Sequence, residues 1–147
     1  MIYGTCSAAR EYEERGKISE WLQLFLRNDG HNTALADGLL QEERCYIGLK
    51  MLPLFLLDQI KSGAPEYLND QDSIDYFFLV VDRMKQAYGN WDIPPLIVEY
   101  GENGFYVNDG RHRLEMYRQL GIPEAPAVLW TTGTRLRDQL LELLRSC

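Results

Sequence analysis

The sequence predicts an α+β fold, in which a small mixed sheet packs with helices. Short runs rich in β-branched and aromatic residues alternate with longer segments of helical periodicity. Turns that contain glycine or proline separate these segments, and no repeat or low-complexity tract interrupts them. A chain of 147 residues is also the length of one domain. A domain of this size can bury about 68–70% of its unfolded surface.

The first part of the chain, residues 1–43, is expected to form a helical extension of the core at residues 44–147. Residues 8–27 have the apolar spacing of an amphipathic helix, and Gly16 is a possible break in it. Asn32 can cap a short helix that follows. The extension carries the glutamates Glu11, Glu13 and Glu14. They indicate a solvated helix face, which leaves a carboxylate directed towards an active site as the alternative.

The core is expected to open with a strand at residues 44–51, followed by a short helix at residues 54–61. Asp70 or Asp72 can cap the next helix. One face of that helix carries apolar residues, and this stripe is typical of a core-facing helix rather than of a cofactor site. The stripe consists of Ile74, Phe77, Phe78, Val81 and Met84. The remaining elements are predicted as a hairpin at residues 94–100 and 105–107, a helix at 110–120, a strand at 125–130 and a helix at 134–145.

Charge and cysteine content narrow the classes of function. The formal net charge is -7, so the chain lacks the broad basic footprint of a nucleic-acid-binding protein, and DNA is an unlikely partner. The three cysteines are far apart and in no CxxC spacing, which is typical of reduced thiols in a cytoplasmic protein. No leader pattern opens the chain, and the apolar runs are too short to span a membrane. A soluble cytoplasmic protein is therefore expected.

The most informative motif is the run from Asn108 to Arg113, which reads NDGRHR. It places Arg111, His112 and Arg113 in the first turn of a predicted helix. The amides and dipole of a helix start are already electropositive, and each added cation costs up to ~1 kcal/mol there. The same arrangement becomes favourable when an anion rests on the amides and arginine forks close over it. The motif therefore predicts a phosphate-binding turn.

Residues 93–130 resemble the ParB/sulfiredoxin superfamily. The resemblance consists of a proline-led strand, a tight hairpin, the Asp-Gly-Arg-His-Arg loop, a helix, Gly-Ile-Pro and a closing apolar strand. Members of that superfamily bind nucleotides: ParB proteins hydrolyse CTP, sulfiredoxins use ATP, and archaeal relatives phosphorylate free serine. Other members are described as nucleases. The resemblance implies a nucleoside triphosphate or diphosphate with Mg²⁺, while zinc and haem are not expected.

The resemblance also assigns roles within the loop. Gly110 would let the backbone approach the anion, and the three residues after it would contact phosphate oxygens. Sulfiredoxins have a nucleophilic cysteine where this chain has Arg111, so sulfiredoxin activity is not expected. Sulfiredoxins also carry lysine, serine and threonine on the preceding helix. Residues 70–73 at the matching position are Asp-Gln-Asp-Ser, which is acidic and lacks lysine.

Asp109 and Asn108 have open roles. Asp109 can ligate Mg²⁺ beside the phosphates or act as the catalytic base towards a hydroxyl. Alternatively, it is a turn residue whose side chain caps the helix at residues 110–120. Asn108 is expected to orient the loop. Two histidines without HxxxH spacing or cysteine partners disfavour a zinc site.

The cationic residues of the motif also have structural alternatives. His112 can donate to a phosphate or bond to nearby backbone. Arg113 can contact the anion or pair with Glu99 or Glu115. Arg111 lies four residues before Glu115, so an ion pair between these two needs no ligand. Arg118 is expected at the surface.

Three hypotheses of function follow. The first is an Mg²⁺-dependent nucleotide hydrolase or small-molecule phosphotransferase, with Asp109 as catalytic residue. The second is a non-catalytic, nucleotide-responsive module that uses its acidic N-terminal helices as a surface for a protein partner. The third is a DNA-associated ParB-like protein or nuclease, which the net charge disfavours.

Overall fold

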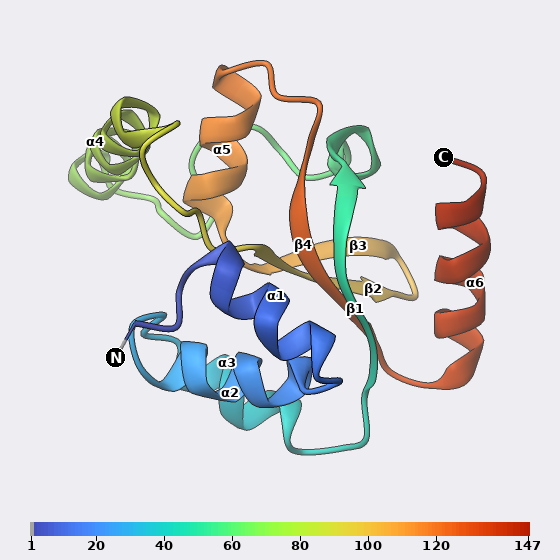
Figure 1. Ribbon diagram of the computed structural model, residues 1–147. Coiled ribbons are helices and arrows are strands. Elements are labelled where there is room, and N and C mark those ends of the chain that lie inside the picture. The colour runs from blue at the N-terminus through green and yellow to red at the C-terminus, as the bar shows by residue number, and fades with distance from the viewer. Residues whose placement is uncertain (1) are drawn as a thin grey trace.

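The computed structural model describes residues 2–147, and its fold is α+β, as predicted. A four-stranded mixed sheet lies between two layers of helices (Figure 1). β4 is antiparallel to β1 and parallel to β2, and β2 and β3 form an antiparallel hairpin. In their order across the sheet, the strands are β1 (Cys45–Pro53), β4 (Glu124–Thr131), β2 (Leu96–Gly101) and β3 (Gly104–Asp109).

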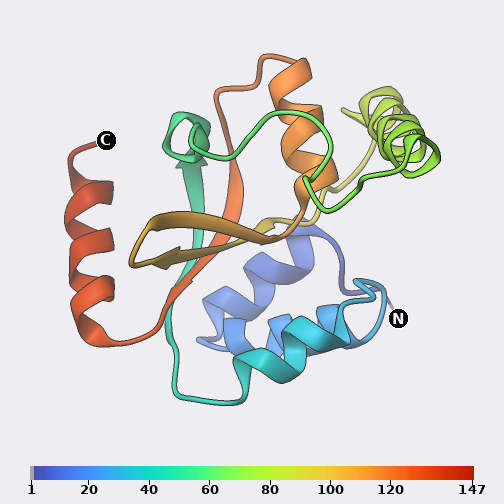
Figure 2. The same ribbon diagram turned by 180° about the vertical axis from the view of Figure 1, so that it is seen from behind.

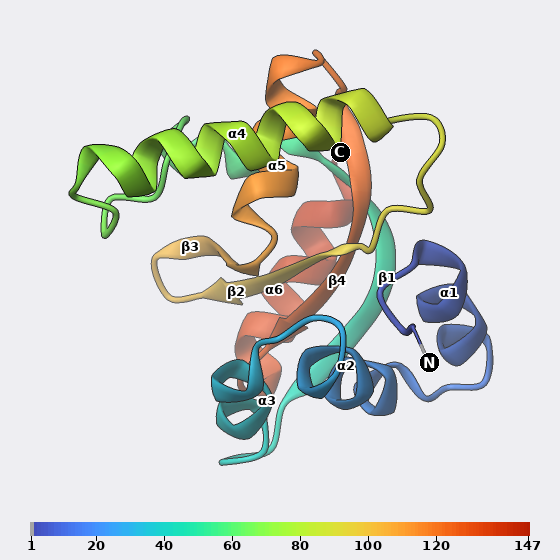
Figure 3. The ribbon, with the colours of Figure 1, turned by 90° about the vertical axis from the view of Figure 1, so that its left-hand side faces the viewer.

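The N-terminal extension covers one face of the sheet (Figure 3). Its helices are α1 (Cys6–Glu14), α2 (Ile18–Arg27) and α3 (Thr33–Leu39). Gly16 separates α1 from α2 and has a φ of 71°, which confirms the predicted break. Ile97, Val128 and Trp130 of the sheet are buried in the same apolar cluster as these helices. The extension is therefore packed onto the core.

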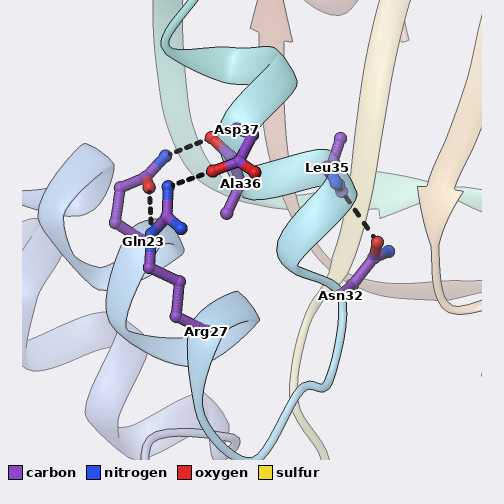
Figure 4. A network of polar contacts seen from close by, with 6 residues as sticks. All are labelled: Gln23, Arg27, Asn32, Leu35, Ala36 and Asp37. Carbon is purple, nitrogen blue, oxygen red and sulfur yellow. Dashed lines mark hydrogen bonds and ion pairs between the residues drawn. The ribbon is translucent and has the colours of Figure 1, made fainter.

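Polar contacts hold α2 and α3 together (Figure 4). Arg27 Nη2 pairs with Asp37 Oδ1 at 2.8 Å, and Gln23 Nε2 donates to the Ala36 carbonyl at 2.9 Å. Asn32 caps α3, as predicted, because its Oδ1 accepts from the Leu35 amide at 3.3 Å. These contacts fix the position of Asn32 beside the sheet.

The remaining helices pack on the opposite face (Figure 2). They are the 3₁₀ turn η1 (Leu54–Leu57) and the α-helices α4 (Gln71–Ala87), α5 (Arg111–Gln119) and α6 (Thr134–Arg145). Strand alternation supplies both cores, since Leu96 and Val98 face these helices while Ile97 faces the extension. Asp70 caps α4, because its Oδ2 accepts from the Ser73 amide at 2.9 Å.

Two elements differ from the prediction. The helix expected at residues 54–61 is only the 3₁₀ turn Leu54–Leu57. The second strand of the hairpin extends to Asp109, where it was expected to end at residue 107. Asn108 and Asp109 therefore belong to a strand end, which fixes their side chains more firmly than a loop would. Within residues 2–147, no helix is both long and apolar enough to cross a membrane.

Candidate functional site

A β-bulge near the end of β3 directs both Asn108 and Asp109 towards the extension. Val98 pairs with Val107 and Ile97 pairs with Asp109, so Asn108 is the extra residue. Asn108 Oδ1 accepts from Trp130 Nε1 at 2.8 Å, and its Nδ2 donates to Glu99 Oε1 at 3.3 Å. These two bonds hold the strand end, as expected of a residue that orients the loop.

Gly110 is the N-cap of α5 and has a φ of 115°, a conformation that favours glycine. A Cβ at this position would lie 2.7 Å from Leu96 Cδ2 and 3.0 Å from Arg113 Nη2. The missing side chain thus lets the Arg113 guanidinium lie against the backbone at the start of the helix.

The first amides of α5 have no partner in the described chain. No side chain caps the helix, and its first backbone bond runs from the Leu114 amide to the Gly110 carbonyl at 2.8 Å. The amides of Arg111, His112 and Arg113 make no hydrogen bond within residues 2–147. Three donors of an electropositive helix end are therefore free to bind an anion.

Arg113 is buried, with 9% of its surface exposed. Its Nη2 donates to the Pro95 carbonyl and to Asp109 Oδ2, both at 3.1 Å. Its Nε is fully enclosed and has no partner within residues 2–147. The predicted partners Glu99 and Glu115 are not used, because the carboxylate on the preceding strand end is closer.

Asp109 is engaged through both carboxylate oxygens. Oδ2 pairs with Arg113, and Oδ1 accepts from Asn32 Nδ2 at 3.2 Å. The side chain does not cap α5, which was its expected structural alternative. Within residues 2–147, no group of three or more histidine, cysteine, aspartate or glutamate side chains is arranged to hold a metal ion. Mg²⁺ at Asp109 would therefore take most of its ligands from water or from phosphate oxygens.

His112 is the second residue of α5, and its ring stacks on Phe77 of α4, with ring centroids 4.5 Å apart and an angle of 30° between the planes. Burial lowers the pKa of His112, the nearby charge of Arg113 lowers it further, and Asp109 opposes both effects. The imidazole is therefore neutral at pH 7, and a nearby anion would favour its protonation.

Arg111 is directed away from Arg113. Its Nη2 donates to the Lys61 carbonyl at 3.3 Å, and it makes no ion pair with Glu115. Glu115 instead accepts from the Gly63 amide at 2.8 Å and from Gln119 Nε2 at 2.9 Å. Arg118, expected at the surface, donates to the Leu57 carbonyl at 2.8 Å. The two arginines of the motif thus do not close over one point.

A hollow of about 440 Å³ opens at the start of α5. We call it the phosphate hollow, after the ligand that the motif predicts. Four of the six predicted site residues line it, and the extension, α4 and the loop before β2 contribute the rest of its wall. The lining residues are Gly4, Phe25, Asp29, Gly30, Met84, Trp91, Pro94, Asp109, Gly110, His112 and Arg113.

The contribution of the extension was not predicted. Asp29 Oδ1 and Oδ2 accept from the amides of Tyr3 and Gly4, at 3.0 and 2.6 Å, and this folds the N-terminal segment against the hollow. Asn28-Asp29-Gly30 was interpreted only as a helix stop. Asn32 was predicted as a cap, but its contact with Asp109 joins residues 77 positions apart, and no local pattern indicates such a contact.

Comparisons with known proteins add no family assignment: no protein-family model matches the chain, and no curated protein matches it in sequence. The resemblance of residues 93–130 to the ParB/sulfiredoxin superfamily therefore stays a prediction from the motif.

Proposed function

We propose that this protein binds the phosphate groups of a nucleotide in the phosphate hollow. The observation that carries the proposal is the convergence of unpaired donors on one turn. Three free amides of α5 and the buried guanidinium of Arg113 lie within the same three residues. A phosphate oxygen satisfies such donors, and the dipole of α5 adds a favourable charge interaction.

The Asp109 carboxylate would compete with a phosphate for Arg113. It already occupies Arg113 Nη2, so it stands where a ligand oxygen would also bind. A phosphate carries more charge than a carboxylate and can accept from amides and guanidinium together. Mg²⁺ would remove the repulsion between Asp109 and the phosphates, because it takes ligands from one or two carboxylates plus phosphate oxygens.

Turnover is the catalytic extension of this proposal. The oxygen of water or of a small hydroxyl-bearing acceptor would attack the terminal phosphorus, and the bond from that phosphorus to its bridging oxygen would break. Asp109 would take the proton of the attacking oxygen. Arg113, with Arg111 turned inward from Lys61, would stabilise the charge on the transferred group.

A second candidate function is a nucleotide-responsive module without turnover. The contact between Asn32 and Asp109 favours it, because this contact connects the phosphate hollow directly to the cap of α3. A ligand that displaces Asp109 would also displace a partner of Asn32. A protein partner would then bind the exposed acidic surface of the extension.

A thermal-shift titration tests the binding. Pyrophosphate, ADP, ATP, CTP and GTP are added with and without Mg²⁺ to the wild type, to Arg113→Lys and to the exposed control Arg83→Lys on α4. A ligand at 100 times its Kd should stabilise the fold by about 2.7 kcal/mol. Lysine keeps the charge but not the fork, so the shift should fall in Arg113→Lys and persist in Arg83→Lys.

The same samples separate the two functions. Release of inorganic phosphate or transfer to an acceptor, abolished by Asp109→Asn, supports the enzyme. Binding without turnover supports the responsive module. A wild type that no phosphate compound stabilises would overturn both.

A further inference from the structure

A second hollow, of about 370 Å³, lies at the opposite end of α5. We call it the aromatic hollow. The C-terminal ends of α4 and α5, the start of α1 and parts of β1 and β4 surround it. Its wall includes three aromatic side chains, those of Tyr88, Trp91 and Tyr117. Aromatic faces of this kind attract organic cations through the ring quadrupole.

Tyr117 supplies an unpaired polar group to this hollow. The residue is only 4% exposed, and its hydroxyl makes no hydrogen bond within residues 2–147. The hydroxyl oxygen of Tyr117 is nevertheless accessible to solvent. Among residues 2–147, the polar side-chain atom that is both unpaired and fully enclosed is Arg113 Nε, not this oxygen. Burial raises the pKa of Tyr117 to about 12, so the phenol stays protonated and neutral. Its lone pairs can accept from an N–H or O–H group of a bound ligand.

The charges around the aromatic hollow are negative. Asp92 and Glu124 line it, and its lining includes no lysine, arginine or histidine. Asp92 accepts from the amides of Cys6 and Ser7, at 3.0 and 3.3 Å, and so neutralises the positive start of α1. Glu124 is exposed and makes no ion pair within residues 2–147.

Two helix ends add to this field. The C-terminal turns of α4 and α5 border the hollow, and a helix C-terminus carries about half a negative charge. Lys85 and Arg118 lie in these turns, but they donate to Gln119 Oε1 and to the Leu57 carbonyl, and neither lines the hollow. The exposed Arg10 approaches from outside, where its Nη2 lies 3.7 Å from Cys6 Sγ. It does not line the hollow. The wall thus combines three aromatic side chains and two carboxylates with apolar side chains such as Met51 and Ile122.

We propose that the aromatic hollow binds an organic ammonium group. The cation would lie against the rings of Tyr88, Trp91 and Tyr117, with Glu124 providing the opposite charge. A free small amine and a methylated lysine side chain share this chemistry. The proposal is independent of the phosphate hollow, although Trp91 borders both.

Calorimetric titration of the full chain tests the proposal. The probes are choline, its neutral isostere 3,3-dimethylbutan-1-ol and a short trimethyllysine peptide. Choline should bind about tenfold more tightly than the isostere, because only choline carries the charge that the rings and Glu124 recognise. Tighter binding of the peptide than of choline would identify a protein side chain as the source. Equal binding of choline and its isostere, or binding of neither cation, would overturn the proposal.

Variants localise the binding. Glu124→Gln should weaken choline binding severalfold, while Glu66→Gln, the same change at an exposed position outside the hollow, should not. Arg10→Gln should strengthen it, most clearly at low salt. Trp91→Phe should retain binding and Trp91→Leu should lose it. The proposal fails if Glu124→Gln matches Glu66→Gln while the melting temperatures of all variants stay unchanged.

Discussion

The two ends of α5 face hollows of opposite chemical character. At the first end, three amides are unpaired, and the buried guanidinium of Arg113 lies beside them. At the other end the carbonyls are paired, with the Leu120 amide bonded to Met116 and the Ile122 amide to Tyr117, both at 3.0 Å. Aromatic rings and carboxylates replace the arginine there. Under the two proposals, a single short helix would present an anion site and a cation site, because its dipole has opposite signs at its two ends.

The largest loss of stability is expected when the first end loses its arginine. The side chains of Arg113 and Asp109 are 10% and 17% exposed, so Arg113→Met leaves a poorly solvated carboxylate without its partner. This change should lower the free energy of unfolding by about 3–5 kcal/mol. Tyr117→Phe, at the other end, removes a hydroxyl that has no protein partner and should cost about 0.5 kcal/mol or less. Urea unfolding measures both.

A second mutation checks the cause. If the uncompensated charge of Asp109 is responsible, Asp109→Asn added to Arg113→Met should recover part of the loss. Equal stability of Arg113→Met and Tyr117→Phe would instead show that the ion pair of Arg113 with Asp109 adds no more to stability than the unpaired hydroxyl of Tyr117.

A smaller effect is expected at the glycine that opens α5. Gly110→Ala forces a side chain into a backbone conformation with φ of 115°, which costs about 1–3 kcal/mol, and it adds contacts to Leu96 and Arg113. Gly16→Ala is the control, because Gly16 also has a positive φ, of 71°, and no heavy atom lies within 4 Å of the added Cβ. The excess loss in Gly110→Ala measures the close approach of Arg113. No excess would mean that the guanidinium can move away freely.

The smallest effect concerns the pH dependence of stability. The pKa of His112 is lowered in the folded protein, mainly by burial, while the unfolded chain takes up the proton near pH ~6.5. Stability that is present above that pH is therefore lost as the pH falls through the lower folded-state pKa. His112→Gln should remove this part of the acid dependence, whereas the exposed control His31→Gln should not.

NMR titration of the imidazole extends the same test to ligands. Pyrophosphate should raise the pKa of His112, because it brings negative charge to the first end of α5. Choline at the other end should leave that pKa unchanged. A shift with choline, or an unchanged acid dependence in His112→Gln, would contradict this assignment.

Local patterns predicted the elements well where one physical signal dominates. The leucine spacing of residues 134–145 indicated the bounds of α6, and the cap Asn32 was correct. The cap of α4 was left open between Asp70 and Asp72, and it is Asp70. The helix expected at residues 54–61 was wrong because apolar spacing cannot distinguish one 3₁₀ turn from a helix that continues. The bulge at Asn108 also escaped prediction, because register depends on the partner strand.

The site was predictable only in part. The motif placed Gly110, His112 and Arg113 together at a helix start, and they do lie there. Anion contact was predicted for Arg113, with pairing to Glu99 or Glu115 as the structural alternative. That alternative named the wrong carboxylates, because the bulge that brings Asp109 beside Arg113 was not foreseen. The walls supplied by Asp29 and Trp91 depend on how distant segments pack, which their own neighbours in the sequence do not indicate.

The contact between Asn32 and Asp109 has a consequence for how the molecule becomes ordered. One side chain completes both the first turn of α3 and the end of β3, although α3 packs in the apolar cluster of the extension and β3 packs in the cluster on the opposite face. Neither the extension nor the end of β3 can form all of its hydrogen bonds until the other is folded. The extension and the end of β3 should therefore unfold and refold as one cooperative unit. A core without the first helices should be less ordered than the same residues in the full chain.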